Sequence, residues 1–282
     1  MNVSTENFNS TEFHPSTIIQ ELLILTGFRT GLLCFNLLFG VPTHSYVLWL
    51  IARGRRIPSE IFNVNLTVCE IIYSFIFFTQ ILPSLETFQS LELLHRFLQG
   101  LGVTGRPLFQ CLICVERYLA VVHPVTFLKF KPLRYRVICC TAVWITTLGS
   151  CLAAMTIQIL SNLKTYSWFF LLQFLLFLSI QLFCLVAVLR ALKQSGPGER
   201  GRERKEENHM KRRAFHLILI TTVTLVVMFV PFVITGFMSV LQEQGVSLIW
   251  CLGLCCFIMA GFVQPVLYLH RVGKLFCLFF MK

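Results

Sequence analysis

Seven apolar runs, each about as long as the span that crosses a lipid bilayer, constrain this chain more than any other feature of its sequence. A membrane-spanning helix needs about 20 mostly apolar residues, because its backbone groups must pair within the helix where water is absent. Of the 282 residues, 56% are hydrophobic and 13% are charged. The expected spans cover roughly 31–52, 61–82, 97–122, 137–159, 168–189, 214–238 and 247–269. The sequence therefore predicts an all-α membrane protein, a bundle of seven transmembrane helices.

The positive charges are concentrated on one side of these runs. Lys and Arg cluster in the segments that follow the first, third, fifth and seventh runs, whereas the opposite segments contain only Arg29, Arg96 and Lys164. Cytoplasmic loops are enriched in Lys and Arg. We therefore predict a multi-pass plasma-membrane protein with an extracellular N-terminus. The formal net charge of +11 is explained by this topology and does not indicate a nucleic-acid partner.

The spans divide the chain into an extracellular N-terminal segment (1–30), a membrane domain (31–270) and a cytoplasmic tail (271–282). Asn2 and Asn9 each begin an Asn-x-Ser/Thr sequon in the first segment and are predicted glycosylation sites.

Most of the 12 cysteines lie inside apolar runs, where we expect them to pack as small hydrophobic residues. Their spacing predicts neither a metal site nor a cofactor. Without paired carboxylates, a nucleophile elbow or a His cluster in the spans, we do not expect an enzyme.

Two charged residues inside the apolar runs need a partner. Glu70 lies about nine residues into the second span, and Arg106 lies in the third span, which runs in the opposite direction. Both are therefore expected near the middle of the bilayer, where an unpaired charge is costly. We predict a buried ion pair between Glu70 and Arg106. Two interpretations stay open: the pair fixes the packing of the helices, or it acts as a conformational latch.

Several short motifs occur in a consistent order along the spans. They are Glu116-Arg117-Tyr118 followed by His123-Pro124, Asn65-Leu66 ahead of Glu70, Trp144, Phe229-Val230-Pro231 and Gln264-Pro265-x-x-Tyr268. In these motifs the chain resembles the rhodopsin-like G-protein-coupled receptors, over about residues 30 to 280. The family usually has Trp-x-Pro where this chain has Phe229-Val230-Pro231. The branch of the family that it resembles most contains the nucleotide and protease-activated receptors.

The resemblance implies a receptor that passes the signal of an extracellular ligand to a heterotrimeric G protein through outward movement of the sixth helix. Arg117 would be held by Glu116 in the inactive state and would contact the G protein in the active state. A short amphipathic eighth helix would follow the seventh span, with Cys277 as a palmitoylation site. The residues implied in coupling and activation are Glu116, Arg117, Tyr118, Phe229, Pro231, Gln264, Pro265 and Tyr268.

The outer third of the bundle is the expected place for the ligand. An anionic or peptide ligand would suit the positive charge of Arg96, although a single Arg near lipid headgroups is commonly an interface anchor. The residues that could converge there are Arg96, Gln99, Gln158, Phe237 and Gln242.

The chain also departs from the family pattern. The family usually has a disulfide at the outer end of the third helix, but position 92 is Glu and the loop around 161–167 has no cysteine, so we predict no disulfide. Arg106 stands where the family generally has a small polar residue beside a sodium ion, and we expect sodium to have little effect. Two alternatives stay open: a transporter or channel, because intramembrane charges also line solute paths, and a receptor-like protein that has lost signalling.

Overall fold

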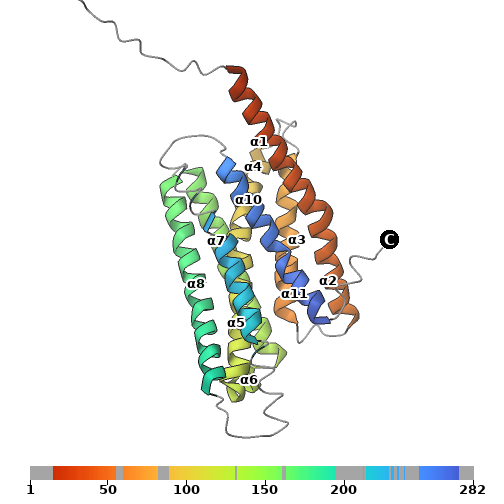
Figure 1. Cartoon of the computed structure of the whole chain (residues 1–282), viewed down its shortest axis with the longest axis vertical. Helices are drawn as coiled ribbons and strands as arrows, with labels where there is room; N and C mark the ends of the chain where they lie inside the picture. The colour runs from red at the N-terminus through yellow and green to blue at the C-terminus, as the bar shows by residue number, and fades with distance from the viewer. Residues whose placement is uncertain are drawn as a thin grey trace, which may run out of the picture.

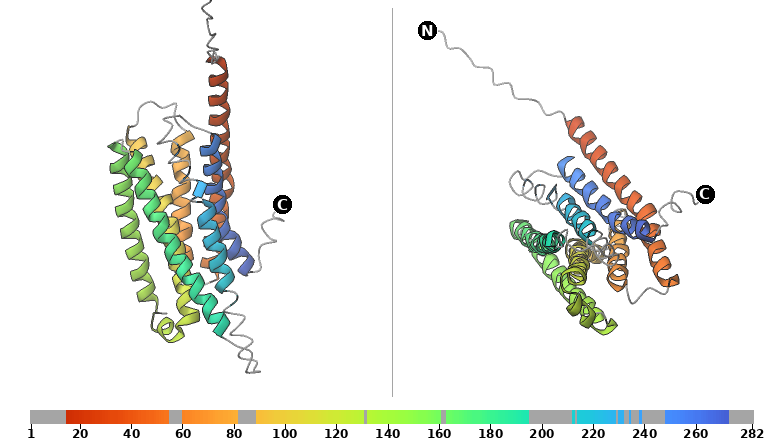
Figure 2. Two further views of the ribbon diagram at one scale, coloured as in Figure 1. Left: turned by 60° about the vertical axis from the view of Figure 1, so that its left-hand side comes forward. Right: turned by 60° about the horizontal axis from the view of Figure 1, so that its bottom comes forward.

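The computed structural model describes residues 15–54, 60–81, 89–130, 132–160, 163–194, 214–228 and 248–272, with isolated positions between 212 and 238. Within these residues the backbone is helical almost throughout and contains no strand. The helices lie roughly side by side in one elongated bundle (Figures 1 and 2). The predicted all-α fold is confirmed. The predicted eighth helix, at 273–282, lies outside the described residues.

Seven helical segments of the described chain correspond to the seven predicted spans. A short helix, α6 (Pro124–Phe130), connects the third segment to the fourth. In chain order the seven segments are α1 (Pro15–Phe35), η1 (Asn36–Gly40) and α2 (Val41–Arg53); α3 (Ile61–Ile81); α4 (Gln89–Gly100), η3 (Leu101–Gly105) and α5 (Arg106–Val122); α7 (Leu133–Ile159); α8 (Leu163–Gln194); the helix over 214–228, called here the sixth helix; and α10 (Leu248–Gly261) with α11 (Val263–Val272).

The first helical segment begins earlier than the predicted span. Helix α1 starts at Pro15, whereas the apolar span was expected from residue 31, so the second half of the predicted N-terminal segment is helical. The upper part of α1 projects beyond the other helices (Figure 2). Of the described helices, four are long and apolar enough to cross a membrane by composition alone: Leu23–Arg53, Leu133–Ile159, Thr165–Lys193 and Cys251–His270.

Prolines explain where the long helices become irregular. A proline lacks a backbone N–H, and its ring clashes with the carbonyl four residues earlier, so the preceding turn widens or breaks. The π-helical turn η1 precedes Pro42, and η3 precedes Pro107. Helix α10 ends just before Pro265, which lies in α11. Local chemistry therefore sets these bends.

The bundle places apolar side chains outside and polar ones inside. Leu38, Ile145 and Phe183 are 69%, 66% and 63% exposed on the surface. Glu70, Arg106 and Gln181 are buried. A water-soluble protein shows the opposite arrangement, because large contiguous apolar patches on its surface would cause association. The exposed apolar surface therefore fits a lipid surrounding, in which buried polar groups must find partners within the protein.

Helix α5 lies at the centre of the bundle and contacts α3, α7 and α8. Helix α4, which precedes it in the same segment, packs closely against α7. Gly100 permits this approach, because a Cβ atom there would come within 2.7 Å of the Cα of Cys151. The third segment thus packs against several neighbouring helices.

Basic residues mark one end of the bundle, which we call the basic end. Arg53 ends α2, Lys129 lies in the last turn of α6, and Lys193 lies in the last turn of α8. In Figure 1, α6 and the end of α8 lie at the bottom of the bundle, and the end of α2 lies at its lower right. The start of α1 lies at the opposite end. The described part of the chain therefore keeps the charge asymmetry that the sequence predicts.

Candidate functional site

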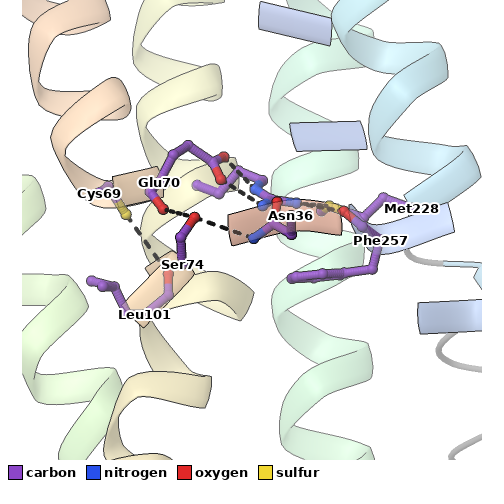
Figure 3. A network of polar contacts seen from close by, with 8 residues as sticks. Asn36, Cys69, Glu70, Ser74, Leu101, Met228 and Phe257 are labelled. Atoms are coloured by element: carbon purple, nitrogen blue, oxygen red, sulfur yellow. Dashed lines mark hydrogen bonds and ion pairs between the residues drawn. The ribbon is translucent and has the colours of Figure 1, made fainter. Parts of the chain in front are cut away.

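The structure brings Glu70 of α3 and Arg106 of α5 into contact in the middle of the bundle. Arg106 Nη2 donates to Glu70 Oε2 at 2.5 Å, and Arg106 Nε lies against Glu70 Oε1. Arg106 Nη1 donates to the carbonyl oxygen of Phe257 in α10 at 2.8 Å and approaches the Sδ of Met228 in the sixth helix at 3.3 Å. Figure 3 shows Glu70, Met228 and Phe257 around this contact. One guanidinium thus joins four of the seven helical segments.

The ion pair is almost completely shielded from solvent. The side chains of Arg106 and Glu70 are 3% and 6% exposed. The Cζ atom of Arg106 lies 5.5 Å from the ring centroid of Tyr73 and 4.5 Å from that of Phe257. Burying two charges is costly unless the geometry is good and the remaining donors are satisfied. The contacts with both carboxylate oxygens, the Phe257 carbonyl and the two rings offset much of that cost.

Other polar groups extend the cluster towards the first helical segment. Ser74 Oγ donates to the backbone oxygen of Glu70 at 2.8 Å, and Asn36 Nδ2 donates to Ser74 Oγ at 3.2 Å (Figure 3). His44 of α2 is 4% exposed and lies close enough to Glu70 and Arg106 for their charges to act on it. The sequence analysis did not single out His44. Its position as a polar residue within the first apolar run could have indicated that it has a partner inside the bundle.

A second buried ion pair lies near the basic end. Arg136 Nη2 of α7 is 2.6 Å from Glu116 Oε1 of α5, and the two side chains are 9% and 12% exposed. The Cζ atom of Arg136 also lies 5.9 Å from the ring centroid of Phe62. In the sequence, Arg136 counted only as a loop charge, so this pair was not predicted. Glu116 therefore has a cationic partner on a neighbouring helix.

A cavity at the basic end brings together several residues that the sequence predicted for coupling. Its volume is about 30 Å³, room for about two water molecules. Gln264 Nε2 of α11 donates to Thr221 Oγ1 of the sixth helix at 3.5 Å across one wall. The lining residues are Asn63, Ile113, Arg117, Leu217, Thr221, Gln264, Leu267 and Tyr268. Helices α3, α5 and α11 and the sixth helix therefore enclose Arg117 at their basic ends.

At the opposite end, three of the five predicted ligand-binding residues meet between α4 and α7. Arg96 Nη1 donates to the backbone oxygen of Gln158 at 2.8 Å, and Arg96 Nη2 donates to Glu92 Oε1 at 2.5 Å. Gln158 Nε2 donates to Gln99 Oε1 at 3.2 Å. Phe237 and Gln242 lie outside the described residues. Glu92, at the position where the family usually has a cysteine, thus partners Arg96.

The remaining predicted residues fall into two groups. Tyr118 contacts His123, with 3.0 Å between its hydroxyl and His123 Nε2. Pro231 is helical, and Pro265 is buried within α11. The residues that lie outside the described part of the chain are Phe229, Asn2, Asn9 and Cys277.

Asn65, in the Asn65-Leu66 motif of the second span, contacts helix α7. Trp144 Nε1 of α7 donates to Asn65 Oδ1 of α3 at 2.8 Å. Asn65 Nδ2 in turn donates to the backbone oxygen of Ile61 at 2.8 Å. Asn65 and Trp144 both belong to motifs that carry the resemblance, and their hydrogen bond joins α3 to α7. Among the described residues, no group of three or more His, Cys, Asp or Glu side chains is placed to hold a metal ion.

Comparison with known families identifies the class of protein as a membrane receptor. Residues 45–268 match the family described as "7 transmembrane receptor (rhodopsin family)". The chain belongs to this family, and the predicted resemblance to the rhodopsin-like receptors is confirmed. The family consists of receptors rather than enzymes, and its members cross the membrane several times.

Individual relatives are about a quarter identical to this chain over the aligned residues. The human C-C chemokine receptor type 8 is 24% identical over 237 residues, which cover 76% of this chain and 64% of that receptor. The human chemokine XC receptor 1 is 28% identical over 280 residues, or 88% of this chain and 79% of that receptor. The rat hydroxycarboxylic acid receptor 2 is 28% identical over 151 residues, or 48% of this chain and 39% of that receptor. The first of these matches thus spans just under two thirds of its relative.

Proposed function

We propose that this chain is a plasma-membrane receptor with an extracellular N-terminus that passes the signal of an outer ligand to a heterotrimeric G protein at its basic end. Membership of the rhodopsin family supports the general role. The observation that carries the proposal is the cavity lined by Arg117, because it lies at the end where the basic helix termini gather. A cytosolic partner would meet the receptor at that end.

Outward movement of the sixth helix would open this cavity. Leu217 and Thr221 form the wall that belongs to the sixth helix, and a long hydrogen bond from Gln264 to Thr221 links that wall to α11. Ligand binding would shift the population towards the open arrangement only to the extent that the ligand binds that arrangement more tightly. Pro231 would provide the bend in the sixth helix, with Phe229 and Tyr268 repacking as it moves. Arg117 would then contact the G protein.

The ligand would bind at the opposite end, beside the hydrogen-bonded residues Arg96, Gln99 and Gln158. Phe237 and Gln242 complete the proposed set. The names of the relatives supply two ligand classes for a first screen, chemokines and hydroxycarboxylic acids.

Replacing Arg117 with Ala tests the proposal. At matched surface expression, we expect basal and ligand-stimulated nucleotide exchange on the G protein to fall about tenfold or more, because a hydrogen bond to a charged group contributes about 1.5–3 kcal/mol. Arg53→Ala is the matched control: it removes the same charge at the same end, from the exposed end of α2, outside the cavity. Its exchange should equal that of the wild type.

Unchanged exchange in Arg117→Ala would contradict the coupling role. Receptor reconstituted in liposomes addresses the transporter alternative, since solute or ion flux without nucleotide exchange would favour that class. Expression at the cell surface with neither exchange nor flux would favour a receptor that has lost signalling.

A further inference from the structure

Arg106 occupies the position at which this receptor family generally has a small polar residue beside a sodium ion. We propose that Arg106 is a built-in cation that takes the place of that ion, so that the receptor has no sodium site between α3 and α5. The proposal depends on the family assignment and on the geometry around Glu70. It does not depend on G-protein coupling.

The oxygen atoms that a cation would need already face the guanidinium of Arg106. Both carboxylate oxygens of Glu70 face the guanidinium, with Oε2 at 2.5 Å from Nη2 and Oε1 against Nε. The carbonyl oxygen of Phe257 accepts from Nη1 at 2.8 Å. A hard cation binds by replacing its hydration shell with such oxygens. Here it would have to displace a charged group that is covalently attached to α5.

Charge and space also exclude a second cation. Glu70 and Arg106 neutralise each other, so an added ion would meet the positive guanidinium at short range in a buried environment. The site is also tightly packed on its α10 side. A Cβ atom on Gly261 would lie 3.1 Å from Arg106 Nη2 and 3.5 Å from Glu70 Oε2. The Sδ of Met228 and the rings of Tyr73 and Phe257 cover other sides of the guanidinium.

A tethered cation differs from a bound ion in one functional respect. Sodium can dissociate, and its occupancy follows its concentration, whereas the Arg106 side chain is always present. Its contacts join α3, α5, the sixth helix and α10. The restraint that this contact places on the middle of the bundle is therefore independent of the sodium concentration.

Thermal unfolding of the purified full-length receptor tests this inference. The melting temperature is measured in sodium chloride and in N-methylglucamine chloride at equal ionic strength. The wild type should melt at the same temperature in both salts. Arg106→Ser removes the tethered cation and leaves Glu70 beside Ser74 and Asn36, and we expect sodium to raise its melting temperature by about 2–4 °C. Arg96→Ser is the matched control, because it removes the same charge outside this cluster, and it should show no sodium effect.

A second variant separates the ion effect from misfolding. Arg106→Ser leaves a buried carboxylate unpaired, which is strongly destabilising. The double variant Glu70→Gln with Arg106→Ser removes both charges and should fold without any sodium response. Sodium-specific stabilisation of the wild type would overturn the proposal, and so would a folded Arg106→Ser receptor that ignores sodium. If Arg106→Ser cannot be purified, the wild-type measurement alone tests the proposal. Equal melting temperatures in the two salts support it, and a higher melting temperature in sodium chloride overturns it.

Discussion

At the residue scale, each of two buried arginines has a carboxylate partner on another helix. Arg106 pairs with Glu70 near the centre, and Arg136 pairs with Glu116 near the basic end. Removing one member of a buried pair leaves the other charge without compensation, and this costs more than the pair itself contributes. Arg136 therefore has a structural part in holding α7 against α5, in addition to any effect on Arg117.

Replacing Arg136 with Gln should lower the stability of the receptor by about 2 kcal/mol, or roughly 4–8 °C in melting temperature, because Glu116 loses a charged hydrogen-bond partner. Thermal unfolding of the purified receptor measures the change. Arg134→Gln is the matched control two residues earlier on the same helix, where the side chain is exposed, and it should shift the melting temperature little. Equal shifts in the two variants would show that the Glu116–Arg136 contact does not stabilise the fold.

The two pairs differ in how far they could be predicted. Glu70 and Arg106 both lie deep in apolar runs, and the opposite directions of the second and third spans place them at one depth, so the cost of an unpaired charge predicts their contact. Arg136 lies at the start of the fourth run, where an arginine can reach water or headgroups without a protein partner. Which face of α7 turns towards α5 depends on packing, and this decides whether Arg136 reaches Glu116.

At the element scale, glycines determine how closely the helices of the third and fourth segments approach. Small residues let membrane helices pack with their backbones close together. Gly100 lies against the backbone of Cys151 in α7, whereas a Cβ on Gly149 would meet nothing within 4 Å. The sequence does not distinguish these two glycines, but only Gly100 lies where two helices approach closely.

Gly100→Ala should destabilise the receptor by about 1–3 kcal/mol, because the added methyl group must push two backbones apart. Gly149→Ala should be neutral or stabilising by up to about 1 kcal/mol, because Ala is the better helix former and the site is open. Comparing the melting temperatures of the two purified variants checks both expectations. A Gly100→Ala receptor that is as stable as Gly149→Ala would contradict the close approach of α4 and α7.

At the scale of the whole molecule, the arrangement of apolar surface and basic helix ends implies a definite orientation in the membrane. Apolar side chains such as Leu38 and Phe183 are exposed on the sides of the bundle, and basic residues end helices at one end. From the positive-inside rule, we propose that this end lies in the cytosol.

Epitope tags at the two chain ends should report opposite compartments. We expect antibody to reach an N-terminal tag on intact cells and a C-terminal tag only after permeabilisation. Glycosidase treatment should lower the apparent mass of the wild type, and the combined Asn2→Gln and Asn9→Gln variant should no longer respond. Detection of both tags in the same compartment would contradict the predicted number of spans.

The sequence alone determined the class of fold, the number of spans and the receptor family, and it predicted the partner of Glu70. It could do so because a bilayer imposes length, polarity and charge rules that act on each segment separately. The tertiary structure decided which helix faces meet. It decided the contact of Arg136 with Glu116, the burial of His44, and the contacts of Arg106 with Met228 and Phe257. It also placed Arg117 in the lining of a cavity. These contacts depend on how whole helices rotate and pack against one another. Side chains that are far apart in the sequence determine that packing jointly.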